Sequence, residues 1–142
     1  MTVHLVKLCV GADSVEDVDS WVKRRAKENA KGPWGRVSHH VTRMFPRRIG
    51  EVLGGGSLYW VIKGVVLVRQ KIVGLEKITG EDGIERCAIL LDPTLVETEA
   101  QPRRAFQGWR YLRPEDAPAD LKKSSKQAPP GLRAELAELG LL

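Results

Sequence analysis

The chain has 142 residues and a formal net charge of +5 at neutral pH, and 42% of its residues are hydrophobic and 29% charged. This balance is ordinary for a globular domain and excludes wholesale disorder. The longest apolar window, residues 58–68, is interrupted by Lys63 and is too short to span a bilayer. We therefore expect no membrane-spanning segment and no membrane partner.

The two cysteines, Cys9 and Cys87, each lie in an apolar run, where a buried free thiol is the expected state. The first residues of the chain lack the basic region and the long apolar stretch of a secretory signal. Both observations predict a cytoplasmic protein in a reducing compartment.

The first part of the chain predicts a strand followed by a helix. Apolar residues at both odd and even positions of Val3–Val10 indicate a strand that is buried on both faces. Ser14 can cap a helix over Val15–Ala30, whose apolar residues recur at helical spacing, and Gly32 and Pro33 end that helix.

Val37–Met44 predicts a second strand, and Pro46 can start a short helix over Arg47–Leu53 that the glycines at 54–56 end. A phosphate-binding loop needs the opposite order, in which a strand leads through glycines into a helix. We therefore interpret these glycines as a flexible helix exit.

Leu58–Ile78 carries the strongest strand signal, because it is rich in β-branched and aromatic residues. Gly64 within it indicates a bend or bulge, since one residue cannot close a hairpin. Residues 79–83 predict a turn into an antiparallel strand over Ile84–Leu91. Residues 100–113 look irregular.

The expected fold class is α+β, with a mixed or mainly antiparallel curved sheet or small β-barrel of about five strands. The long N-terminal helix and the short second helix pack on this sheet. We expect residues 1–113 to form a single globular domain and residues 114–142 a tail rich in Pro, Lys and Ser. Leu132, Leu136 and Leu139 recur at helical spacing near its end and predict a short amphipathic helix.

Two windows of the sequence contain arginines and no acidic residue. Residues 33–50 contain Arg36, Arg43, Arg47 and Arg48, and residues 100–113 contain Arg103, Arg104, Arg110 and Arg113. Guanidinium groups form bidentate contacts with phosphates, and aromatic residues interleave with these arginines. This combination is typical of proteins that neutralise phosphates while unpaired bases stack. It indicates a nucleic-acid-binding module, with RNA favoured as the partner.

The expected phosphate contacts are Arg43, Arg47, Arg48, Arg103, Arg104 and Arg110, and the expected base-stacking residues are Trp109 and Tyr111, with Trp34 as a further candidate. A structural alternative stays open. The rings can anchor the core, and the arginines can pair with acidic residues such as Glu97 and Glu115. Only the clustering of the two windows in space would make them an electrostatic surface.

A second alternative is a small enzyme whose arginines clamp an anionic, nucleotide-like substrate near His39 or His40. Adjacent strand residues point to opposite faces, so these two histidines cannot share one metal ion. We expect no metal and no cofactor, and we assign no catalytic residue. A third alternative is an adaptor that binds a protein partner through the C-terminal helix.

The chain resembles an alphaproteobacterial family of about this length, domain-of-unknown-function family 1489, for which no activity is assigned. The segments that carry the resemblance are Thr42–Arg48, Gly55–Gly64, Arg69–Gln70 and Phe106–Leu112. The resemblance covers nearly all of the chain to about Leu121.

The helix–glycine–strand unit over Arg48–Lys63 is also similar to that of PUA-like and ASCH small β-barrels. In that group the unit borders a groove that binds RNA or a modified base. This chain departs from the Gly-x-Lys-x-x-Glu-x-Arg pattern of ASCH domains, because Gly55 is followed by Gly-Ser-Leu-Tyr. No residue role is carried over from it, and the analogy concerns the fold.

Overall fold

A computed structural model of the protein describes residues 1–121. Its elements are β1 (His4–Leu8), α1 (Val15–Asn29), β2 (Ser38–Thr42), α2 (Ile49–Leu53), β3 (Ser57–Ile62), β4 (Val65–Thr79), β5 (Glu85–Leu91), β6 (Val96–Pro102), β7 (Trp109–Leu112) and a single 3-10 turn at Pro114–Asp116. The amphipathic helix expected around Leu136 lies outside the described residues.

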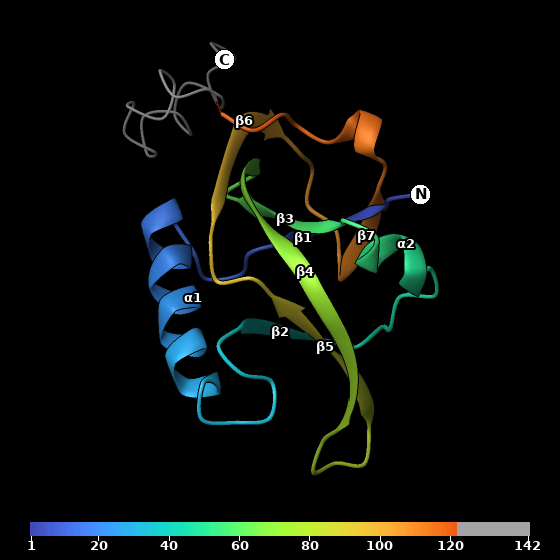
Figure 1. Ribbon diagram of the computed structural model, residues 1–142. Helices are drawn as coiled ribbons and strands as arrows, with labels where there is room; N and C mark the ends of the chain where they lie inside the picture. Colours follow the sequence, from blue (N-terminus) through green and yellow to red (C-terminus); the bar gives the residue numbers. More distant parts are fainter. Residues whose placement is uncertain (122–142) are drawn as a thin grey trace.

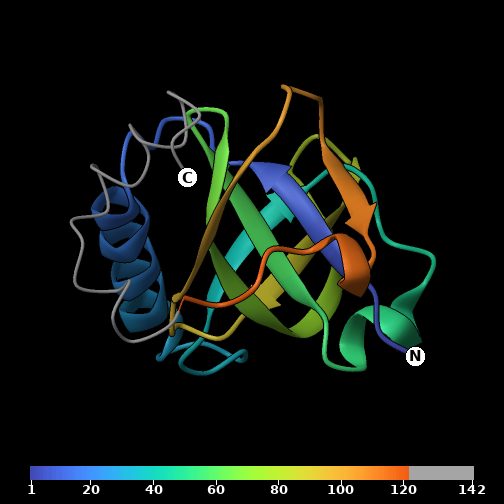
Figure 2. The ribbon, with the colours of Figure 1, turned by 90° about the horizontal axis from the view of Figure 1, so that it is seen from above.

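The expected α+β class with a curved, mainly antiparallel sheet is confirmed. The strand order is β2-β5-β4-β3-β1-β7, with β6 paired to β4, and β1–β3 is the parallel pair. The sheet is open, with β2 and β7 at its two ends. The strands curve round a common interior, with α1 on one side and α2 on the other (Figures 1 and 2).

Helix α1 forms for the reasons that its sequence suggests. The hydroxyl oxygen of Ser14 accepts a hydrogen bond from the backbone N–H of Asp17 at 3.2 Å, which caps the first turn. Val15, Val18 and Val22 form a buried stripe on one face of the helix. This stripe packs against the interior of the sheet together with Leu5 and Trp60.

The 15-residue strand β4 organises the sheet. One of its edges pairs with β3, and the other pairs first with β6 and then with β5. A register shift between Ile72 and Gly74 marks the point where β5 takes over. Strand bulges increase the local bend and twist, which here turns the sheet round its interior.

The expectation of a bend at Gly64 is wrong, because β3 and β4 form a tight hairpin in which Ile62 pairs with Val65. The turn consists of Lys63 and Gly64, and both have positive φ, 49° and 81°. Two consecutive positive φ angles are the requirement of the tightest hairpin turns. The sequence showed a glycine for the second position only, so the turn was missed.

The sheet has seven strands rather than about five. The two missed strands are β6 and β7, and both overlap the 100–113 segment that looked irregular. Pro102 and Gly108 break the local pattern, and β7 is only four residues long. It is held by antiparallel pairing with β1, a partner more than a hundred residues away in the sequence.

The glycines at 54–56 form a tightly packed connection rather than a flexible one. A Cβ atom on Gly56 would lie 2.4 Å from the carbonyl oxygens of both Val3 and Val52. The N–H of Gly56 also donates to the Val52 carbonyl at 2.9 Å. The absence of a side chain lets α2 approach the start of β1.

The globular part extends beyond the expected boundary at Arg113. The N–H of Glu99 donates to the Ala119 carbonyl at 2.8 Å, and the N–H of Leu121 donates to the Glu97 carbonyl at 3.0 Å. The residues up to 121 therefore lie against β6 as an added edge. None of the helices within the described part of the chain is long and apolar enough to cross a membrane.

Candidate nucleic-acid interface

The two arginine windows meet at β7. The phenolic oxygen of Tyr111 accepts hydrogen bonds from the backbone N–H groups of Arg47 and Arg48, at 3.0 and 3.1 Å. The indole N–H of Trp109 donates to the carbonyl of Met44 at 2.9 Å. The loop between β2 and α2, which carries three of the four arginines of the first window, is thus fixed along the strand that carries part of the second.

Trp109 and Tyr111 occupy structural positions, which corrects the expectation that their rings are presented to bases. Trp109 is only 7% exposed and packs in the main core. Its ring meets that of Tyr111 edge to face at 4.8 Å between centroids. The guanidinium of Arg48 lies 5.3 Å from the centre of the Tyr111 ring. Both aromatic residues therefore hold the loop and the strand together.

Five of the predicted phosphate ligands form no ion pair with residues 1–121 and keep their charge available. They are Arg43, Arg47, Arg103, Arg104 and Arg110, which we call the β7 basic surface. All are exposed except Arg103, which is half-buried. The guanidinium of Arg110 lies 5.6 Å from the centre of the Phe106 ring.

The remaining arginines differ in their surroundings. Arg48 forms an ion pair with Glu51 one helical turn away. Arg113 pairs with Glu115 at 3.4 Å and with Asp116 at 2.9 Å. The structural alternative therefore holds for these two arginines. Arg103 lies beside the turn between β3 and β4, where its backbone N–H donates to the Gly64 carbonyl at 2.8 Å.

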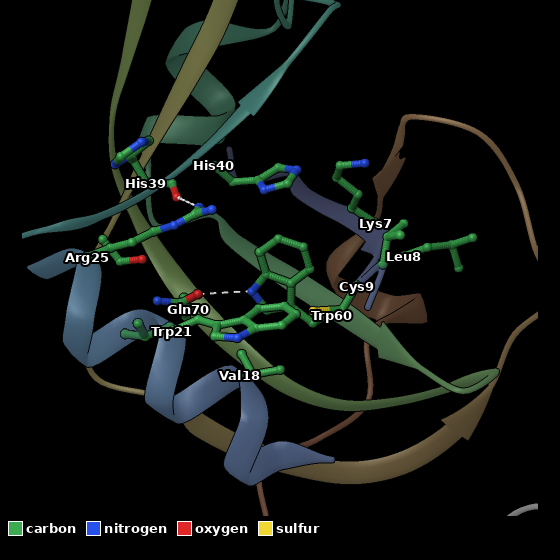
Figure 3. Close-up of a pocket in the computed structure, with 13 residues that line it drawn as sticks. Lys7, Leu8, Cys9, Val18, Trp21, Arg25, His39, His40, Trp60 and Gln70 are labelled. Atoms are coloured by element: carbon green, nitrogen blue, oxygen red, sulfur yellow. Dashed lines mark hydrogen bonds between the residues drawn. The ribbon is translucent and has the colours of Figure 1, made fainter. Parts of the chain in front are cut away.

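A partly open cavity of about 130 Å³ lies between α1 and the inner face of the sheet. We call it the His40 cavity (Figure 3). Its walls come from β1, α1, β2, β3 and β4, and its lining includes Lys7, Cys9, Trp21, Arg25, His40 and Trp60. It combines two indole rings with two basic side chains, and Figure 3 shows Trp21 and Trp60 pointing into it from different elements.

The position of the Trp60 ring is fixed by a buried polar chain. The indole N–H of Trp60 donates to Oε1 of Gln70 at 2.9 Å, and Nε2 of Gln70 donates to the Asp92 carbonyl at 3.0 Å. Gln70 is fully buried. Because buried polar groups that lose a partner are costly, this chain holds the indole in one orientation.

His39 and His40 point to opposite sides of β2, as their adjacency on a strand predicts. Nδ1 of His39 lies 2.9 Å from Nδ2 of Asn29, and the His39 carbonyl accepts a hydrogen bond from the Arg25 guanidinium. The ring of His40 instead meets Trp60 edge to face at 5.1 Å. Only the imidazole of His40 therefore lies over the indole that forms the cavity wall.

Burial lowers the pKa of His40 to about 4, with smaller contributions from the positive charges of Lys7, Arg25 and His39. General acid–base catalysis works best with a pKa near the working pH. A neutral imidazole can instead donate one hydrogen bond and accept another. The cavity is therefore better suited to binding a ligand than to transferring a proton through His40 near neutral pH.

Lys7 and Cys9 complete the β1 side of the cavity. Burial lowers the pKa of Lys7, while burial raises the pKa of the Cys9 thiol to about 11. A thiol with so high a pKa is a poor nucleophile at neutral pH. Lys7 alternates with Leu5 and Cys9 and therefore lies on the same inward face of the strand. A charged residue within that apolar series is the sequence signal that could have revealed the cavity.

A second cavity, of about 430 Å³, lies on the outer face of the sheet and is lined by His4, Tyr59 and Arg69 among others. Arg69 is already engaged there, because it donates to both carboxylate oxygens of Asp120 at 2.8 Å and to the Ser57 hydroxyl at 3.0 Å. We interpret this cluster as the attachment of the 114–121 segment to β4. Within residues 1–121, no group of three or more His, Cys, Asp or Glu side chains is arranged to hold a metal ion.

The fold and the two features described so far define an α+β protein with an open curved sheet, an arginine-bearing edge and a small cavity under its helix. The chain belongs to a family of proteins of unknown function (DUF1489), whose sequence pattern matches residues 5–142. Neither a curated protein nor a solved structure matches the chain.

Proposed function

We propose that the protein binds single-stranded nucleic acid, RNA in preference to DNA, along the β7 basic surface. The observation that carries the proposal is the pair of hydrogen bonds from Arg47 and Arg48 to Tyr111, because they bring together basic residues that lie more than fifty positions apart in the sequence. Arginines without carboxylate partners, held on a fixed strand and loop, are suited to neutralising successive phosphates.

Base stacking in this account does not depend on Trp109. Unpaired bases stack on guanidinium planes as well as on aromatic rings. Arg110, which lies over the half-buried ring of Phe106, offers such a plane on β7. We favour RNA as the partner because specific RNA recognition usually takes place at unpaired segments whose bases can be splayed out.

The charge of the chain outside the two arginine windows also favours binding at the β7 basic surface. Outside the two arginine windows, acidic residues outnumber basic ones. A nucleic-acid strand is therefore attracted more strongly to the β7 basic surface than to the rest of the molecule on average. The cysteines of the described chain, Cys9 and Cys87, are both free thiols, and we infer a cytoplasmic setting for the activity.

The test is an anisotropy titration of a labelled single-stranded oligouridine with the full chain and with an Arg103→Ala/Arg104→Ala variant. We expect the variant to bind about tenfold more weakly, because fewer counterions are released when two phosphate contacts are lost. The matched control is Arg24→Ala/Lys27→Ala, which removes two exposed charges from α1. Equal losses in both double variants, or binding by neither the wild type nor the variants, would overturn the proposal.

A further inference from the structure

We propose that the His40 cavity takes a single pyrimidine ring of the uracil type, with two carbonyl oxygens. This inference deepens the proposed function, because the ring would belong to an unpaired nucleotide of the bound strand. It can nevertheless be measured with free nucleotides, without the strand.

The size of the cavity sets the kind of ring. Its volume is about 130 Å³. An apolar cavity of roughly 150 Å³ in another protein accommodates one benzene ring. The His40 cavity is therefore the right size for a six-membered heterocycle and too small for the two fused rings of a purine to enter fully.

The polar lining selects among pyrimidines. Lys7 and Arg25 bring hydrogen-bond donors and positive charge to the cavity from either side of His40 (Figure 3). Uracil and thymine present carbonyl oxygens as acceptors, whereas cytosine presents an amino donor. The amino group of cytosine would face cationic donors, so the lining favours the ring with two carbonyls. The neutral imidazole of His40 can accept from the ring N–H.

The apolar lining provides the surface on which a flat ring rests. Trp60 is held by Gln70 and cannot rotate without leaving a buried polar group unpaired. Trp21 of α1 contributes a second indole ring. Unpaired bases stack on aromatic side chains of this kind whatever their sequence.

The cavity adjoins a second hollow that contains two positively charged side chains. Leu8, Cys9 and Val10 line both the His40 cavity and an adjoining hollow of about 220 Å³, which also contains Lys63 and Arg103. A base in the cavity would place its phosphate near these two cations. Arg103 is also one of the five arginines of the β7 basic surface, so a strand whose base enters the cavity would have this cation beside its phosphate.

The experiment titrates the full chain with uridine 5′-monophosphate and cytidine 5′-monophosphate and follows tryptophan fluorescence and binding heat. We expect saturable binding of the uridine nucleotide, at least tenfold tighter than that of the cytidine nucleotide. Lys7→Met should weaken uridine-nucleotide binding about tenfold or more, because a charged hydrogen bond is lost. Lys71→Met, which changes an exposed lysine on β4, should leave it unchanged.

A chemical-protection measurement on the wild-type protein does not depend on any variant folding. Saturating uridine 5′-monophosphate should protect Lys7 from acylation by an anhydride while Lys71 reacts as before, as read by mass spectrometry. Absence of nucleotide binding, equal affinity for the two nucleotides, or unprotected Lys7 would each overturn the inference. Nucleotide binding without any affinity for oligouridine would instead retain the inference and overturn the proposed function.

Discussion

The hydroxyl oxygen of Tyr111 accepts a hydrogen bond from the backbone N–H of Arg47 at a distance of 3.0 Å. This contact joins a loop between β2 and α2 to a strand near the other end of the described chain. It explains how two segments far apart in the sequence bring Arg47 and Arg48 beside β7, the strand that carries Arg110.

Removal of that hydroxyl gives a direct prediction. Tyr111→Phe should lower the free energy of unfolding by about 1 kcal/mol, because two N–H groups lose their acceptor. It should also weaken oligonucleotide binding, since Arg47 is no longer held along β7. Denaturant unfolding measures the first effect. Tyr59→Phe is the matched control, because the Tyr59 hydroxyl has no hydrogen-bond partner among residues 1–121, and a change of less than about 0.5 kcal/mol is expected there.

The close approach at Gly56 makes a second prediction. Gly56→Ala should destabilise the protein by about 1–3 kcal/mol, because the added Cβ meets two backbone carbonyl oxygens that cannot easily move. In Gly50→Ala, in α2, the added Cβ atom has no neighbour within 4 Å, so this substitution should be neutral or stabilising by about 0.5 kcal/mol. Equal effects of the two substitutions in thermal unfolding would show that the packing of Gly56 is misassigned.

The pKa of His40 predicts how stability depends on pH. Because the folded-state pKa of about 4 lies below the ordinary value of 6.5, the unfolded chain takes up the proton first. Stability should therefore be complete above pH 6.5 and fall as the pH is lowered toward 4. Between pH 7 and pH 5 the loss from this group amounts to about 2 kcal/mol.

Urea unfolding at these two pH values tests this expectation, with His40→Gln as the comparison. The variant should lose clearly less stability over the interval, although burial also lowers the pKa values of His4 and His39 and leaves it some dependence. The same pH dependence in both proteins would mean that the imidazole of His40 is not buried as described.

Much of the fold is predictable from local pattern. Ser14, the apolar stripe of α1 and the two-sided burial of β1 follow from capping and periodicity, and the structure confirms all three. The hairpin at Lys63 was not predictable in the same way, because lysine rarely takes a positive φ and only the pairing of β3 with β4 imposes it. Strand β7 is equally non-local, since its pairing partner is β1.

The candidate site, too, is predictable from local sequence only in part. The arginines could be identified from their clustering in the sequence, whereas the burial of Trp109 depends on Met44, a residue from the other window. The His40 cavity is lined by residues from five elements, so no local sequence motif indicates it. The inward parity of Lys7 is the one local sign, and it acquires meaning only once β1 is known to face α1.

The salt dependence of RNA binding reports how many phosphates the arginines neutralise. If the five free arginines of the β7 basic surface each neutralise a phosphate, the logarithm of the affinity for single-stranded oligouridine should fall with the logarithm of salt concentration with a slope of about −3.5. In Arg103→Ala/Arg104→Ala the slope should shrink to about −2. A slope near zero in the wild type, or the same slope in both proteins, would contradict the account.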